Sequence, residues 1–211
     1  MKHIESIQKL FTKNFIENPL IETFEAGNLL ITSGHLTASD PMITAEMPAF
    51  ATIFAHGSFP VLVHKETESN CIAYVEVVFG NTPITSWKLA VAEGQNIDEL
   101  QDGEIYGFQV ESGMGCLMDI ESQKDLNSLE QHLFHRKGED FMGIYEEFFH
   151  EHFFQQDGAI NQYAFLKPHE EKEGNLFAFE TGYGEGFYAS YIGFDQNNNP
   201  VKLVCEFIEI I

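Results

Sequence analysis

The sequence predicts an α+β domain, mainly antiparallel β-sheet or a β-sandwich, with an N-terminal helix and a helical pair near residues 122–154. Two observations predict this class. Short apolar segments bounded by Gly, Pro, Asn and Asp recur over residues 28–120 and again over 160–210, as in strands. Apolar residues return at helical spacing only at the N-terminus and over residues 122–154. A chain of 211 residues commonly forms one domain, so we expect residues 1–211 to share one core.

The first segment is expected to be an amphipathic helix. Ile4, Ile7, Phe11 and Phe15 recur at the spacing of one helical face. We therefore expect a helix over residues 3–16, packed on the β-rich body.

The expected strands have lengths that are common in globular proteins. Residues 71–79 illustrate the pattern, because the odd positions are all apolar while Glu76 falls on the other face, as expected for a largely buried strand. The expected segments are residues 28–32, 59–64, 71–79, 86–92, 105–110, 115–120, 160–166, 175–181, 186–194 and 201–210.

The helical pair is expected as an insertion between strands, at about residues 122–154. Leu126, Leu129 and Leu133 have helical spacing, and a second apolar series runs from Phe141 to Phe149. Gly138 lies between the two series and is expected to end the first helix.

The charge of the chain excludes several classes of partner. Asp and Glu number 33 against 11 Lys and Arg, which gives a formal net charge of −22. Such a chain repels phosphate backbones, and Arg136 is the only arginine available for bidentate contacts, so we expect no nucleic-acid ligand. No apolar run approaches the length of a spanning helix, so we expect no membrane partner either. Cations and basic proteins are the natural charged partners, although the same charge can serve solubility alone.

The first fifteen residues and the cysteines favour a cytoplasmic location. Glu5, Lys9 and Lys13 interrupt what would have to be the apolar part of an export signal. Three cysteines, distant from one another and without C-x-x-C spacing, are expected to be reduced, buried thiols.

Three motifs resemble cofactor sites, and each lacks a feature that such a site requires. The glycine-rich segment 182–186 is followed by a strand pattern instead of the helix that a nucleotide fingerprint requires, which predicts a turn. Residues 195–206 match part of a calcium-loop template, but Pro200 replaces the required glycine, so a hairpin loop is expected. Glu147 and His150 have the spacing of a di-iron motif in a single copy only. We expect no cofactor and no metal.

The sequence also offers candidate catalytic or ligand-binding residues near turns, where exposed polar groups can meet. They are His35, Asp40, Asp119, Glu185 and Tyr188. Each also has a structural explanation: Asp40 in an Asp-Pro turn, Asp119 as a cap at a strand end, Glu185 in a solvated turn, and Tyr188 as a core or interface ring.

Several phrases in a fixed order resemble an uncharacterised bacterial family, the domain of unknown function 4241. The resemblance spans most of the chain from about Leu29 onward. Its phrases are residues 33–36, 40–42, 59–61, 87–90, 106–108, 113–119, 175–176 and 182–188, followed by Gly193 and Asp195. The family usually has aspartate where this chain has Glu111, Glu185 and Glu206. The resemblance implies kinship and brings no established activity.

Two functional hypotheses follow. The first is a binding or interaction protein, such as an immunity-like protein that neutralises a basic partner through its acidic surface. The alternative is an enzyme or small-ligand binder with a carboxylate-lined pocket. The sequence leaves open whether the protein is an enzyme.

Overall fold

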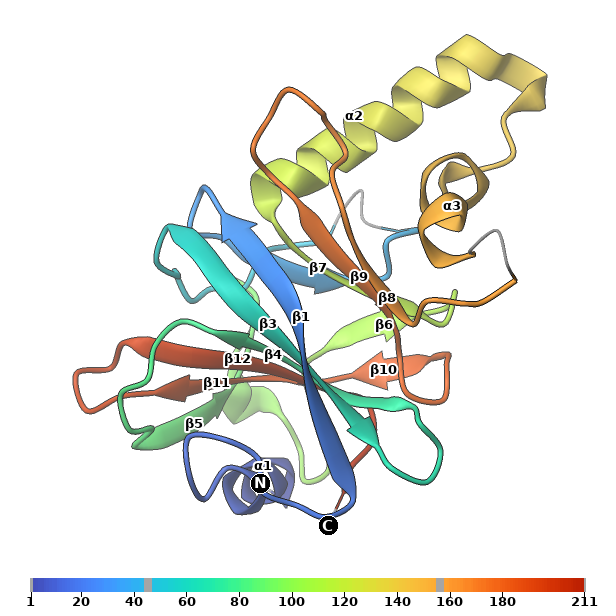
Figure 1. The fold of residues 1–211 in the computed structure, drawn as a ribbon. Coiled ribbons are helices and arrows are strands. Elements are labelled where there is room, and N and C mark those ends of the chain that lie inside the picture. Colours follow the sequence, from blue (N-terminus) through green and yellow to red (C-terminus); the bar gives the residue numbers. More distant parts are fainter. Residues whose placement is uncertain (1, 44–46, 155–157, 211) are drawn as a thin grey trace.

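The computed structural model describes residues 2–43, 47–154 and 158–210, and the side chains from Ile4 onward within these ranges. Strand accounts for 36% of the chain and helix for 20%, so the predicted α+β class is confirmed. Figure 1 shows two sheets stacked on each other, with α2 and α3 on one outer side and α1 on the other.

The larger sheet has six strands in the order β1-β3-β4-β12-β11-β5, all antiparallel. Its strands are β1 (Ile21–Ile31), β3 (Gly57–Glu66), β4 (Ile72–Val78), β5 (Ser86–Leu89), β11 (Ser190–Phe194) and β12 (Pro200–Glu206). The smaller sheet has the order β2-β7-β9-β8, with β2 (Leu36–Ser39), β7 (Met114–Asp119), β8 (Tyr163–Leu166) and β9 (Leu176–Glu180). A separate pair joins β6 (Phe108–Val110) to β10 (Gly186–Tyr188).

Three apolar clusters hold these layers together. The largest fills the space between the two sheets, with residues such as Val75, Leu117, Phe177 and Leu203 fully buried. A second cluster lies between the small sheet and the helices. The third lies between the large sheet and α1. Because β7 is covered on both faces, all six of its residues are buried, which explains its continuous apolar run.

The helices follow the predicted pattern in outline. α2 (Ile120–Lys137) ends at Gly138, as expected, and Leu126 and Leu133 are buried against the small sheet. The second helix of the pair is short. A π-helical turn (Tyr145–Phe149) leads directly into α3 (His150–Phe153). Short 3-10 turns lie at Ile97–Glu99 and Gly138–Asp140.

The N-terminal helix is shorter than predicted. α1 covers Lys2–Leu10 instead of residues 3–16, and Phe15 is 55% exposed, so its assignment to the packed face was wrong. Beyond the helix, the Asn14 side chain donates to the carbonyls of Asn81 and Thr82, at 3.1 and 2.8 Å, which ties this segment to the chain that precedes β5. Ile7 and Phe11 do pack on the large sheet, as predicted.

Several strands differ from the prediction. β1 covers Ile21–Ile31 instead of residues 28–32, and β5, β6 and β12 are shorter than expected. β2 was not predicted, because only Leu36 and Ala38 in it are apolar, too few for a strand pattern. The single strand expected over residues 186–194 is two strands in different sheets, β10 and β11. The chain passes close to its neighbour there: a Cβ atom on Gly107 would lie 2.1 Å from the carbonyl oxygen of Tyr188, so only glycine fits.

Candidate functional site

Asp40 fixes a turn of the backbone. It follows β2 directly, is almost completely buried, and accepts hydrogen bonds from the N–H groups of Glu111 and Ser112, at 2.9 and 2.8 Å. It also accepts from the Ser112 hydroxyl at 2.9 Å and from the N–H of Met42 at 2.8 Å. Its carboxylate oxygens are therefore occupied in holding the turn between β6 and β7.

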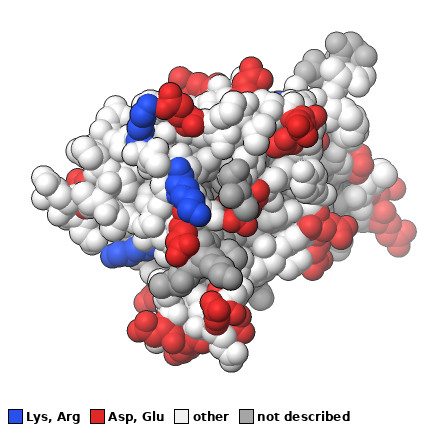
Figure 2. All heavy atoms as spheres, turned by 90° about the horizontal axis from the view of Figure 1, so that it is seen from below, with Lys and Arg blue, Asp and Glu red and all other residues white. Residues whose placement is uncertain are grey.

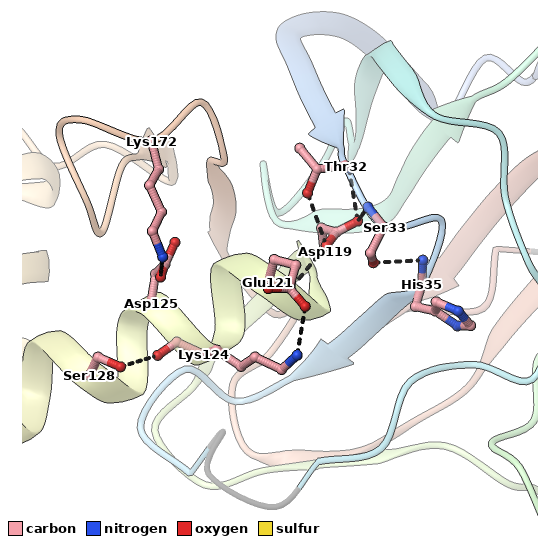
Figure 3. A network of polar contacts seen from close by, with 9 residues as sticks. All are labelled: Thr32, Ser33, His35, Asp119, Glu121, Lys124, Asp125, Ser128 and Lys172. Atoms are coloured by element: carbon pink, nitrogen blue, oxygen red, sulfur yellow. Dashed lines mark hydrogen bonds and ion pairs between the residues drawn. The ribbon is translucent and has the colours of Figure 1, made fainter.

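Asp119 joins the end of β1 to the start of α2 (Figure 3). It caps α2 by accepting from the N–H of Glu121 at 2.9 Å, and it accepts from the N–H groups of Thr32 and Ser33 at 3.0 and 2.8 Å. These are the contacts of a cap, which is the structural role expected for Asp119 at the end of its strand. The exposed ring of His35 lies at the same end of β2 but points away from Asp119 (Figure 3).

Tyr188 and Glu185 belong to the opposite end of the small sheet. The Tyr188 hydroxyl donates to the carbonyl of Gly184 at 2.7 Å, which closes the glycine-rich turn, and Glu185 is exposed on that turn. Gly184 packs beside Gly113, in the turn that Asp40 holds.

The five candidates therefore form two groups. His35 and Asp119 lie at one end of β2, and Asp40, with the turn that carries Glu185 and Tyr188, lies at the other. The five residue-to-residue steps from His35 to Asp40 span roughly 17 Å in an extended chain. The structure does not bring all five into one pocket, because the strand that separates them is longer than a small ligand is wide.

A buried row of ionisable side chains crosses the large sheet beneath α1, and sequence reasoning missed it. Glu76 lies between His64, whose Nε2 is 2.9 Å from Oε2, and Lys202, whose ammonium pairs with Oε1. The Thr23 hydroxyl lies 2.8 Å from His64 Nδ1 and completes the row. The residues come from β1, β3, β4 and β12, so only the strand register reveals them. The signal in the sequence was a lone glutamate inside an apolar strand.

The environment of Glu76 favours its charged form. Burial alone would raise the pKa of this carboxyl, but the contacts with His64 and Lys202 outweigh burial and hold the pKa below its ordinary value. All three side chains are at most 5% exposed. These three side chains therefore hold a charge inside the domain, closed to solvent and ligands, whereas Thr23 at the end of the row is exposed.

Glu206, the last residue of β12 in the same sheet, has a raised pKa instead of a lowered one. Burial, together with the nearby charge of Glu209, raises the pKa of Glu206 to about 7. The Tyr191 hydroxyl donates to Oε2 at 3.3 Å, while the buried Oε1 has no partner among the described residues. This carboxyl is held protonated in slightly acidic solution.

The family model described as Protein of unknown function (DUF4241) matches residues 29–205. The chain belongs to this family. The match begins within β1 and ends within β12, so it includes both sheets, the helical pair and all five candidate residues, and it leaves out α1. No curated protein and no solved structure matches the chain significantly. Membership in DUF4241 therefore confirms the resemblance and assigns no activity.

Acidic side chains are concentrated in this DUF4241 member in the segment between β5 and β6, residues 93–104, which we call the acidic loop. It exposes Glu93, Asp98, Glu99, Asp102 and Glu104, and the sequence has no lysine, arginine or histidine between Lys88 and Lys124. Among the described side chains, none of these five carboxylates forms an ion pair. Figure 2 shows a face of the molecule on which Asp and Glu side chains far outnumber Lys and Arg.

The acidic loop has a fixed backbone in spite of its charge. Ile97, Leu100 and Ile105 pack against the apolar cluster under α1, and their acidic neighbours face solvent. Asn96 caps the short turn by accepting from the N–H of Asp98 at 3.1 Å, and its carbonyl accepts from the Tyr106 hydroxyl at 3.2 Å. The carboxylates are therefore presented in a defined arrangement.

Two further features bear on ligands. In the ranges that the structure covers, no three His, Cys, Asp or Glu side chains are grouped as a metal site would require. Within the same ranges, no helix is long and apolar enough to cross a membrane.

Replacing Glu76 by glutamine should lower the free energy of unfolding by about 3–5 kcal/mol, because Lys202 would remain buried without its counter-charge. Urea denaturation followed by circular dichroism measures this change. The matched control is Glu17→Gln, which breaks the exposed pair with Lys13 and should cost less than about 1 kcal/mol. Equal losses in the two variants would contradict the assigned role of the row.

Replacing Glu206 by glutamine should change how stability depends on pH. The folded-state pKa of about 7 lies above the ordinary value of 4.5, so the folded state binds the proton more tightly, and wild-type stability should fall as pH rises from 4.5 to 7. The variant carries no proton to lose, so it should be more stable than wild type at pH 8, by about 1–3 kcal/mol, and nearly equal at pH 4.5. Melting temperatures across this range test the effect, and parallel curves for the two proteins would show that Glu206 is not the group responsible.

Proposed function

We propose that this protein is a binding protein that recognises a basic partner protein through its acidic surface, in the manner of an immunity-like inhibitor. The observation that carries the proposal is the acidic loop, with five exposed carboxylates and no cation paired to any of them among the described side chains. Carboxylates without a cationic partner in their own chain are available to pair with the cations of another molecule.

The physical advantage of such a surface is fast and selective encounter. A net charge of −22 produces a negative field that extends beyond contact and attracts basic proteins while it repels acidic ones. At physiological ionic strength the field is screened over about 8 Å, so the last approach depends on where the carboxylates lie. The fixed backbone of the acidic loop supports this arrangement, because less ordering is required when a partner binds.

The same charge disfavours nucleic acid as the partner, and the free thiols of Cys71, Cys116 and Cys205 support a reducing compartment such as the cytoplasm. Cys71 is only partly buried, unlike the other two. The alternative of an enzyme or small-ligand binder has less support, because the oxygens of Asp40 and Asp119 are engaged by backbone N–H groups.

Affinity capture tests the proposal. The protein is immobilised, a bacterial lysate is applied at about 0.05 M sodium chloride, and bound proteins are released at about 0.5 M, where screening shortens the reach of charges to a few ångströms. We expect a small set of basic proteins, identified by mass spectrometry. The control is an unrelated protein of similar isoelectric point at the same density. Retention identical to that control would contradict the proposal, because it would reflect ion exchange alone.

A further inference from the structure

A groove of about 440 Å³ lies directly beside the acidic loop. Its apolar lining comes from the end of the large sheet and from two neighbouring segments. It includes Leu89 of β5, Ile192 and Phe194 of β11, Pro200 of β12, and also Ile53 and Ile97. The groove thus lies at the β5 edge of the large sheet, between the segment around residue 53 and the base of the acidic loop. Its volume falls within the range of about 300–1,000 Å³ that is typical of ligand pockets, enough to seat a few side chains.

Two residues of the lining lie at its borders: Ile53 at the border with solvent, and Ile97 at the border with the acidic loop. Ile53 is 64% exposed, so a large aliphatic side chain in the groove lining is left uncovered in the free protein. Ile97 lines the groove and is followed immediately by the exposed carboxylates of Asp98 and Glu99. An apolar lining and an anionic rim therefore lie within a few residues of each other.

The groove lining also contains a charged residue, Lys88. Among the described residues of the lining it is the single cation, and its ammonium lies 4.8 Å from the centre of the Phe194 ring and 3.3 Å from the side-chain oxygen of Asn198. Both partners belong to the β11–β12 hairpin end, whereas Val91 and Ile97 lie toward the acidic loop. Lys88 thus lies at the hairpin end of the lining, while the acidic loop adjoins the lining at Ile97, so a basic group would be drawn to the end at Ile97.

We propose that this groove seats an extended segment of the basic partner in which aliphatic and basic side chains alternate. Successive side chains of an extended chain point to opposite sides, so aliphatic groups can enter the groove while Lys or Arg side chains reach the acidic loop. Charge complementarity selects this occupant over an acidic or neutral apolar segment. The inference rests on the proposed function and adds to it the location of the site and the chemistry of the bound segment.

Fluorescence anisotropy with labelled synthetic peptides at about 0.15 M sodium chloride tests this inference. The probes are a short peptide of alternating lysine and leucine, a lysine and serine peptide of equal charge, and a glutamate and leucine peptide. We expect the lysine and leucine peptide to bind at least about tenfold more tightly than the lysine and serine peptide, since desolvating several leucine side chains contributes more than one factor of ten. The glutamate and leucine peptide should not bind measurably.

Three variants separate the contributions of groove, loop and overall charge. Asp98→Asn with Glu99→Gln and Asp102→Asn should weaken both lysine peptides about tenfold. Ile53→Ser should weaken only the lysine and leucine peptide, by about threefold, because it removes an exposed apolar contact. The matched control, Glu170→Gln with Glu171→Gln and Glu173→Gln, removes the same charge from the exposed loop between β8 and β9 and should change binding less than about twofold.

Different failures have different meanings. Equal weakening in the loop variant and in its matched control would overturn the groove site and leave recognition of basic partners standing as diffuse attraction. Equal binding of the two lysine peptides by the wild type would overturn the apolar part of the site. If the wild type bound neither lysine peptide and captured no basic protein from the lysate, both this inference and the proposed function would fail. Thermal melting of Ile53→Ser confirms that the variant is folded before its binding is compared.

Discussion

The imbalance between acidic and basic side chains is the constraint on which the rest of this structure depends. With 33 carboxylates and 11 lysine and arginine side chains, most acidic groups cannot have a cationic partner within the chain. A carboxylate that is buried must then find backbone N–H groups, share a scarce cation or remain protonated. The domain uses all three solutions.

Each solution has a separate structural consequence. Asp40 and Asp119 use backbone N–H groups, and so the buried acids nearest the turns also define the turns. Glu76 uses Lys202 and His64, which joins neighbouring strands of the large sheet by a polar row within an otherwise apolar face. Glu206 keeps its proton to higher pH than an ordinary glutamate. Other carboxylates lie at the surface without a cationic partner among the described side chains, and the acidic loop carries five of them.

This distribution also explains how much could be predicted from the sequence. Apolar periodicity is a local property, so it predicted the class, the helical pair and most strands. It was wrong at Phe15, which lies beyond the end of α1 and is exposed, and it missed β2, whose buried Thr37 and Ser39 do not resemble core residues. The sequence singled out Asp40 and Asp119 because exposed polar groups can meet near turns, whereas the structure buries both and gives them backbone contacts. The Glu76 row and the groove depend on strands distant in sequence, and their register cannot be deduced from spacing within any one segment.

The central claim is that the acidic loop and the adjoining groove form one binding surface, and amide chemical-shift mapping tests it most directly. The ¹⁵N-labelled protein is titrated with the lysine and leucine peptide, and the shifted amides are placed on the structure. The account predicts that the largest changes fall within residues 51–53 and 88–104 and in the hairpin around Asn198. Changes of equal size over all acidic parts of the surface, or a maximum at the small sheet and its helices, would contradict it.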